Sequence, residues 1–478
     1  MTYELEIVMA GGKATATLDR PGAKGALRGV EDIDHDPLRI DTVHVLRDWL
    51  SRWQMVSKIS TEHSDFRDLP VAGTFRVLGE QLYQIIFRGS VDKAFAESYR
   101  AARDDGQPLR VILSFEEDAT ELAALPWEFL HATDDMGQRF YLATKTELVL
   151  NRSLPTARPQ MSTVDLPLRV LFIMCAPSIA DADQEAQIKE ILSAVRRLKR
   201  DPHKLSVELV RSWNVDHIQE KLRGNPHVVH IIGRARNAVD EAGHIGPEIE
   251  LPGLDGKPQW KPPQVVIDSL TRNKHKKEEL PRLVILHLCP MRPVDFRVSF
   301  ERMAPELIKA GIMAVLAMQY PVSPRAATLF TGKFYDRLIQ GDEIDKIVQD
   351  IRWDMQSQLN DDLLIGTPVL YMQSLSGQLV RQEAELPSEG KLDPHQVSTK
   401  YPANGSGDMR QRLSGAAWSA AADTASAREV DRWINGSNWS DDPCANEQRI
   451  RQHMLLEDPY VKEHGEMYFA MIRVLKES

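Results

Sequence analysis

Cysteine is scarce in this chain: only Cys175, Cys289 and Cys444 occur among 478 residues. Three cysteines give no disulfide framework and fit a reducing compartment, and their spacing does not match a zinc site. No apolar run approaches the roughly 18 residues of a membrane span. The N-terminus lacks the basic start and apolar core of a signal peptide. We therefore expect a cytosolic protein that does not enter a membrane.

An excess of positive charge is also missing, because the formal net charge is −10. Phosphate binding needs a basic face, so nucleic acid is an unfavourable general partner. The sequence has no P-loop, no G-x-G-x-x-G and no H-E-x-x-H motif. We expect no cofactor and no metal. The hydrophobic content of 42% and charged content of 27% are typical of a folded soluble protein.

What the sequence does contain is an alternation of strand and helix patterns in its middle part. Strands are expected at 168–174, 205–209, 228–232, 283–288 and 314–318, with helices at 184–199, 215–222, near 299–310 and within 326–359. Such an alternation is typical of an α/β fold with a mostly parallel sheet flanked by helices on both faces. Residues 241–279 have the composition of a long loop.

The flanking regions have different patterns. Before residue 155 we expect strands at 3–8 and 109–115, a further strand within 140–152, a helix at 44–53, and helical residues 75–102 interrupted at Gly89. A polar stretch rich in Pro, Gly and Ser precedes three helical segments at the C-terminus. We therefore divide the chain into an N-terminal half that completes the sheet (1–155), an α/β domain (165–380), a linker (381–414) and a helical C-terminal region (415–478).

Two of the expected buried strands end beside residues that suggest chemistry. The strand 228–232 is followed by Gly233 and Arg234, and the strand 283–288 is followed by Cys289. Sites in parallel sheets lie at the carboxyl ends of the strands. A cysteine nucleophile there needs a neighbouring base to accept its proton. Arg234 cannot act as that base, because a guanidinium stays protonated in proteins.

At this point the chain resembles the CHAT domain family of caspase-like proteins, which are often associated with tetratricopeptide repeats. The motifs that match, in order, are Ala123–Leu130 with its Leu-Pro-Trp-Glu core, Arg152, His230–Gly233, Leu286–Cys289, Ala310–Ala317, Phe334-Tyr335, Gly341, Arg352 and Pro368–Tyr371. The resemblance covers roughly residues 1–375 and implies a caspase-like fold. It also places Trp127 and Glu128 at the junction of the two halves, where we expect packing and a structural ion pair or helix cap.

The resemblance assigns roles to the residues at the strand ends. In members that act as peptidases, a Cys attacks the peptide carbonyl and a His after the Gly exchanges the proton. The nucleophile corresponds to Cys289, the base to Arg234, and the following glycine, whose amide would stabilise the oxyanion together with that of the Cys, to Ala235. A guanidinium can lower a thiol pKa but is a poor proton donor, so losing the base is expected to cost about 10²–10⁴-fold in rate.

Three histidines are candidates for a substitute base. His287 lies two residues before Cys289 and so shares a sheet face with it. His230 lies on the preceding strand, where a buried structural role is favoured, and His244 follows in the expected loop. Related peptidases with basic specificity commonly carry Asp at the position of His287, so the resemblance does not imply that specificity. For Arg234 we favour a solvated residue at a loop start over a binding group for an acidic side chain.

Two functions follow from these assignments. The resemblance implies a role in bacterial signalling or anti-phage conflict, where a degenerate peptidase would bind protein or peptide partners and regulate an active effector. The alternative is an active cysteine endopeptidase that uses Cys289 with a substitute histidine and is switched on by a partner.

Overall fold

The structure is a computed structural model that describes residues 3–20, 23–33, 71–134, 137–155, 158–175, 189, 193, 203–211, 213–239, 245–253, 257–271, 280–290, 303–320, 322–374 and 376–381. The chain divides into two compact units, residues 1–382 and 383–478. The described residues all belong to the first unit, so the expected linker and helical C-terminal region lie outside them. The expected helices at 44–53 and 184–199 also fall outside the described residues, apart from two isolated positions of the second.

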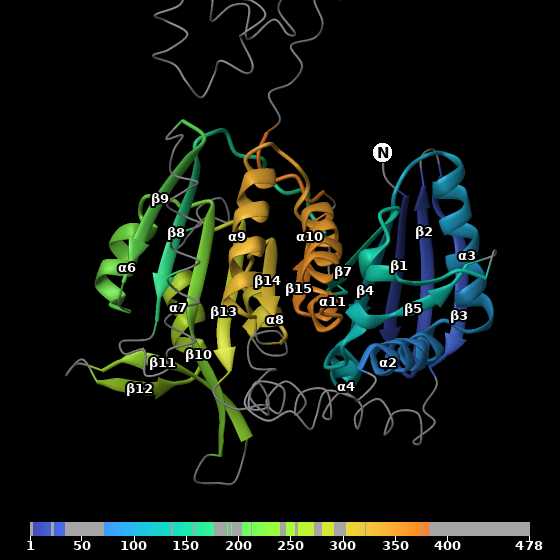
Figure 1. Ribbon diagram of the computed structural model, residues 1–478, viewed down its shortest axis with the longest axis horizontal. Helices are drawn as coiled ribbons and strands as arrows, with labels where there is room; N and C mark the ends of the chain where they lie inside the picture. The colour runs from blue at the N-terminus through green and yellow to red at the C-terminus, as the bar shows by residue number, and fades with distance from the viewer. Residues whose placement is uncertain are drawn as a thin grey trace, which may run out of the picture. The chain divides into compact units, whose positions relative to one another are not determined.

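A single large sheet organises the first unit (Figure 1). In the described residues it has thirteen strands, in the order β12-β11-β10-β13-β14-β15-β7-β4-β1-β2-β3, with β8 pairing with β10 and β9 with β8. Most of the pairs are parallel, among them β9–β8–β10–β13–β14 and β15–β7–β4–β1. Helices flank this sheet, so the protein has the α/β architecture that the sequence predicts.

The central strands form where the sequence has continuous apolar runs, as expected of parallel strands buried on both faces. These strands are β8 (Leu168–Met174), β9 (Leu205–Val210), β10 (Val228–Val239), β13 (Leu283–Pro290), β14 (Ala314–Met318) and β15 (Pro368–Met372). The helices between them are α6 (Val215–Leu222), α8 (Ala304–Lys309), α9 (Pro324–Leu338), α10 (Ile344–Leu359) and α11 (Leu363–Gly366). The predicted alternation of strand and helix is confirmed wherever the structure describes it.

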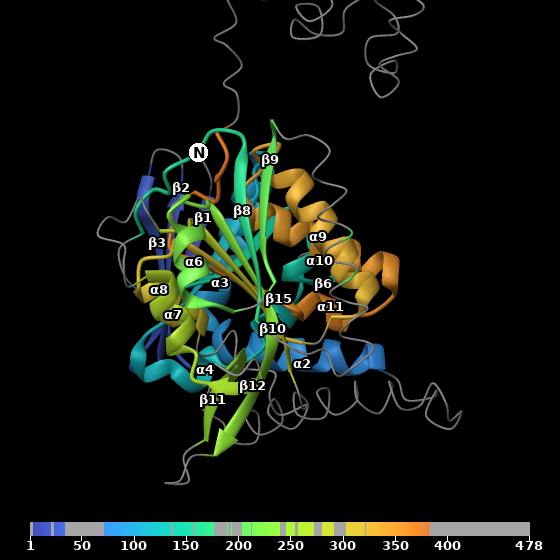
Figure 2. The ribbon, with the colours of Figure 1, turned by 90° about the vertical axis from the view of Figure 1, so that its left-hand side faces the viewer.

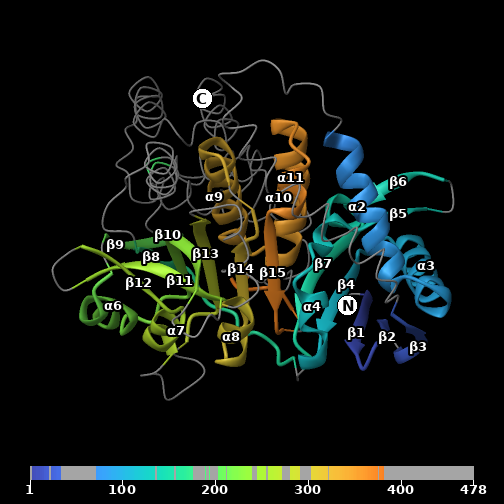
Figure 3. The same ribbon diagram turned by 90° about the horizontal axis from the view of Figure 1, so that it is seen from below.

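Two apolar cores lie on opposite faces of this part of the sheet. Helices α9 and α10 cover one face, and α6, α7 (Gln264–Thr271) and α8 cover the other, as Figure 3 shows. Phe172 and Ile285 belong to the first core, whereas Val229 and Leu286 belong to the second. Both faces are therefore buried, which accounts for the continuous apolar runs of the strands that lead to Arg234 and Cys289.

The N-terminal half extends the sheet with β1 (Tyr3–Ala10), β2 (Lys13–Arg20), β3 (Ala23–Asp32), β4 (Leu109–Phe115) and β7 (Leu148–Ser153). Helices α2 (Val71–Ile86) and α3 (Gly89–Asp104) pack on it, and the predicted interruption at Gly89 is confirmed. Short elements complete this half: η2 (Glu117–Ala119), α4 (Thr120–Ala123), η3 (Trp127–Phe129), β5 (His131–Thr133), β6 (Arg139–Tyr141) and η4 (Leu142–Thr144).

One sequence prediction of a loop is wrong, and two regions contain more strands than the sequence indicates. Strands β2 and β3 follow the expected strand 3–8, and the alternate residues Ala14, Ala16 and Leu18 of β2 are buried. The strand expected within 140–152 is β7, and η4 separates it from β6. The expected loop 241–279 contains β11 (Ile245–Pro252), β12 (Pro258–Lys261) and α7. These strands are half-buried edge elements, which lack the continuous apolar runs of the centre.

The two halves meet at the pair β15–β7. Here the fully buried Arg152 binds Glu128 at 2.9 and 2.6 Å and also donates to the carbonyl oxygens of Ala123 and Leu125. Trp127 is buried beside this pair, and its indole N–H donates to the Leu122 carbonyl oxygen. The expected packing and structural ion pair of Trp127 and Glu128 are therefore confirmed.

Candidate active site

The strands β10 and β13 bring the two halves of the expected site side by side. They pair in parallel, with Gly233 opposite Leu288, Arg234 opposite Cys289 and Ala235 opposite Pro290. The register thus places the backbone of the expected base position directly beside the backbone of the expected nucleophile. The side chain of Cys289 lies outside the described residues.

Strand β10 does not end at residue 232, where the sequence places its end. It continues to Val239, because its neighbour changes on the side away from β13. Strand β8 pairs with it as far as Ile232, and β11 pairs with it from Ala235 onward. Arg234 therefore lies inside a long strand, at the point where one neighbour replaces the other. Figure 2 shows β10 extending with β11 and β12 beyond the other strands.

Arg234 is not the solvated loop residue that the sequence analysis favours. It is only 8% exposed, and its Nη2 forms an ion pair with Oε2 of Glu250, which is 1% exposed. The pairing of Ala235 with Ile249 brings Arg234 and Glu250 opposite each other on adjacent strands. Burial of this guanidinium is possible because an internal carboxylate accompanies it. The Arg234 guanidinium is thus already paired with a carboxylate of the protein itself.

Close packing, and not backbone conformation, explains the glycine at position 233. A Cβ atom at this position would lie 2.9 Å from Cβ of Cys175, at the end of β8. The Cys175 amide donates to the Ile232 carbonyl oxygen at 2.8 Å, which holds the two strands together. Burial raises the pKa of the Cys175 thiol, so this thiol stays protonated and unreactive. The side chain of Ala235 is buried in the core on the α7 and α8 face.

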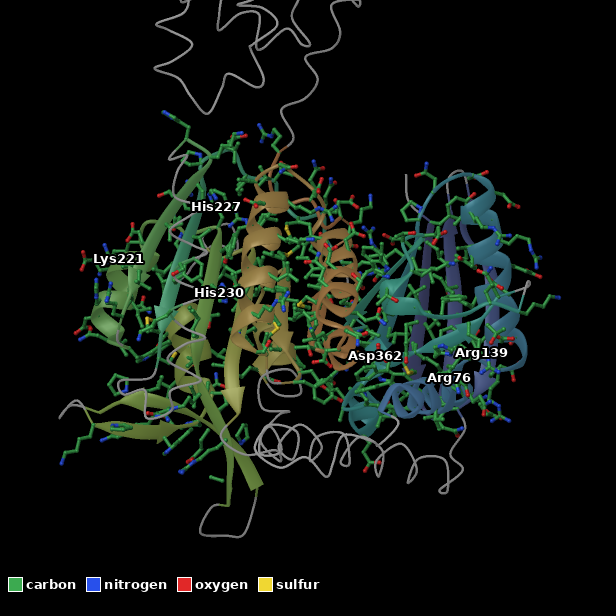
Figure 4. All side chains as sticks on the ribbon, viewed as in Figure 1. Arg76, Arg139, Lys221, His227, His230 and Asp362 are labelled. Carbon is green, nitrogen blue, oxygen red and sulfur yellow. The ribbon has the colours of Figure 1, made fainter. Side chains whose placement is uncertain are left out.

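The two candidate histidines precede the Arg234–Cys289 pair along the adjacent strands β10 and β13, and Figure 4 labels His230. Their rings stack with centroids 6.1 Å apart, and the His230 ring lies 4.8 Å from that of Phe172. His230 Nδ1 shares a hydrogen bond of 3.1 Å with the Tyr335 hydroxyl of α9. His230 is therefore a buried core residue, as expected. His244 lies outside the described residues.

Burial keeps both imidazoles neutral. It lowers the pKa of His287 to about 4. Burial, together with the nearby His287, lowers the pKa of His230 well below its ordinary value. An imidazole with so low a pKa is neutral at pH 7 but is a weak proton acceptor, because effective general bases have a pKa near the operating pH.

Because both imidazoles are buried in the neutral form, we expect the folded protein to lose stability in acid. The unfolded chain protonates His287 near pH 6.5, whereas the folded chain resists protonation down to about pH 4. The contribution of neutral His287 to the free energy of unfolding is therefore fully present above pH 6.5 and is lost as the pH falls through 4. This contribution is about 3 kcal/mol. Urea unfolding measured between pH 7 and 4 should show a weaker pH dependence for His287→Asn. The exposed His217 supplies the control His217→Asn, and an unchanged dependence in His287→Asn would contradict the prediction.

Glu250 is the site residue that the sequence analysis missed. The pattern Glu248-Ile-Glu250 faces Arg234-Ala-Arg236 across the β10–β11 pair, and Arg236 forms a second ion pair with Glu248. The alternation of opposite charges on one face of two strands is the signal that predicts such pairing. It was not recognised because the segment has the composition of a loop.

The described part of the chain contains no group of three or more His, Cys, Asp or Glu side chains arranged to bind a metal ion. Within the same residues, every helix is too short or too polar to span a bilayer.

Comparison with known proteins identifies relatives of this arrangement. The model of the CHAT domain family matches residues 76–426, more than half of the chain. The match continues beyond residue 375, where the sequence motifs end. No curated protein matches the chain.

Solved structures that are similar to this chain include the following three. The crystal structure of the Arg-specific cysteine proteinase gingipain R is 10% identical, with a TM-score of 0.35, over 61% of this chain and 69% of that one. The complex of the pro- and mature domains of RgpB from Porphyromonas gingivalis is 11% identical, with a TM-score of 0.34, over 61% and 71%. The separase–securin complex of Saccharomyces cerevisiae is 12% identical, with a TM-score of 0.32, over 71% and 22%.

Proposed function

This chain belongs to the CHAT domain family, and we propose that it is a degenerate caspase-like peptidase that binds protein or peptide partners. In this proposal it acts in a bacterial signalling or anti-phage conflict system, where it regulates an active effector. The family supplies a cleft at the carboxyl ends of the strands, and this chain keeps the cysteine there without the usual base.

The pairing of Arg234 with Glu250 beside Cys289 is the observation that carries the proposal. A guanidinium cannot take the thiol proton, and it cannot protonate a leaving amine at a useful rate. Glu250 also balances the charge of Arg234, so the pair as a whole gives little electrostatic stabilisation to a thiolate. Both routes to an activated cysteine are thereby weakened.

The alternative function, an active endopeptidase with a substitute histidine, is supported by one observation. His287 is neutral at pH 7 and lies two residues before Cys289 on the same strand. Its complete burial and low pKa make it a weak base, which is why we favour the degenerate peptidase.

An assay of the native chain separates the two. The protein is incubated with an iodoacetamide probe and with a mixed peptide library, alone and with candidate partner proteins, alongside Cys289→Ala. We expect slow labelling of Cys289 and no cleavage that depends on it. Cleavage that disappears both in Cys289→Ala and in His287→Asn would establish the active endopeptidase instead. Partner proteins retained by the native chain and by Cys289→Ala alike would support a binding role.

A further inference from the structure

The ion pair at Arg234 has a feature that simple stabilisation does not explain. Glu250 is almost completely buried, and among the described residues no other cation contacts it. Its Oε2 contacts Arg234, whereas its Oε1 has no hydrogen-bond partner in the part of the chain that the structure describes. A buried carboxylate with one oxygen unpartnered is costly to fold, so its presence at this point requires an explanation.

A neighbouring ion pair also links these strands. Arg236 donates from Nε to Glu248 at 2.8 Å, and its guanidinium lies 4.2 Å from the ring centre of Trp260 on β12. The Arg236 and Glu248 side chains are 36% and 27% exposed. This hydrogen-bonded and partly exposed pair links β10 with β11, and the contact with Trp260 extends the link to β12. Glu248 therefore provides a matched control for Glu250 on the same strand and the same face.

The position of Glu250 fits a role in the chemistry of the site. It lies opposite Arg234 on one side of β10, and Cys289 lies opposite Arg234 on the other side. In a nucleophile–histidine pair, a carboxylate that accepts the second ring N–H fixes the orientation and tautomer of the imidazole and stabilises its charged form. Glu250 occupies the place from which it would act in this way on a group at position 234.

We propose that Glu250 is the positioning residue of this site, whose carboxylate fixes the group at position 234 beside Cys289. In this chain that group is the Arg234 guanidinium, and with histidine at 234 the same carboxylate orients the imidazole. The inference rests on the proposed function, in which position 234 is the former base position. The inference adds that Glu250 is the acidic partner that a base at position 234 would use, although this chain has arginine there.

The test compares Arg234→His with Arg234→His/Glu250→Gln and Arg234→His/Glu248→Gln. The introduced imidazole is identified in ¹H–¹³C spectra as the signal added to those of the 14 native histidines, and its pKa is measured by titration. A contacting carboxylate raises an imidazole pKa by about 1–3 units. We expect Glu250→Gln to remove at least one unit of that shift and Glu248→Gln to leave the pKa nearly unchanged. Equal pKa values with and without Glu250, or equal effects of the two glutamines, would overturn the proposal.

Two further measurements make the test independent of peptidase activity and of whether Arg234→His folds. If Arg234→His gains no peptidase activity but its imidazole still responds to Glu250→Gln, more than the base is missing from the site and the role of Glu250 stands. In the native chain, side-chain ¹⁵N spectra should show slow rotation of the Arg234 guanidinium and fast rotation in Glu250→Gln. Fast rotation in the native chain would contradict the assignment even if Arg234→His does not fold.

Discussion

Replacing Arg234 by histidine is expected to raise Cys289-dependent peptide cleavage by about 10²–10⁴-fold, the usual contribution of general acid–base catalysis. The backbones of residues 234 and 289 are already opposite each other, so the substitution supplies a proton acceptor without moving a strand. Glu250 is already opposite position 234 to receive the second ring nitrogen. The rate is measured on a mixed peptide library at pH 7–8, with cleaved sites identified by mass spectrometry.

Two control variants make this result specific. Arg236→His places an imidazole two residues further along the same face, opposite Glu248, and should produce no cleavage. Arg234→His/Cys289→Ala should lose whatever activity Arg234→His gains. A folded Arg234→His protein, with the thermal stability of the native chain but no added cleavage, would show that more than the base is missing.

Arg152→Met is expected to lower the free energy of unfolding of the first unit by about 3–5 kcal/mol, because it leaves a buried charge without its partner. Glu128 stays buried, and the carbonyl oxygens of Ala123 and Leu125 lose their donor. These groups lie where β7 meets β15, so the loss should affect the junction of the two halves. Urea unfolding followed by tryptophan fluorescence and by far-ultraviolet circular dichroism measures it.

A double variant and a surface variant set the scale for this change. Arg152→Met/Glu128→Met removes both charges and should recover much of the lost stability, since a buried ion pair is often replaceable by apolar side chains. Lys93 and Glu97 form an exposed pair at 3.8 Å, and Lys93→Met should change stability by less than about 1 kcal/mol. A similar small effect in Arg152→Met would show that water replaces the ion pair at the junction.

The central strands were predictable from the sequence for a simple physical reason. A strand buried on both faces is apolar at every position, so runs such as Leu168–Met174 and Leu283–Leu288 are visible without knowledge of their neighbours. The break between α2 and α3 was equally visible, because Gly89 adopts a positive φ of 44° that other residues rarely accept.

The edge strands were not predictable in the same way. Strands β2, β3, β11 and β12 are covered on part of their surface only, so they lack continuous apolar runs, although β2 pairs with β3 and β11 with β12 in local hairpins. The continuation of β10 past Ile232 has the same origin. Its second part, Arg234–Val239, exists as a strand because β11 returns to pair with it.

The sequence by itself determined the chemical identity of the site: a cysteine after one apolar strand, and an arginine after another. That much is local, because the residue type alone decides whether a side chain can accept a proton. Only the tertiary structure decided the environment of these groups. It buried Arg234 against Glu250 and buried His230 and His287 in the core. These contacts depend on strand register and on closure of the β10–β11 hairpin, and the positions of the residues along the chain do not reveal either.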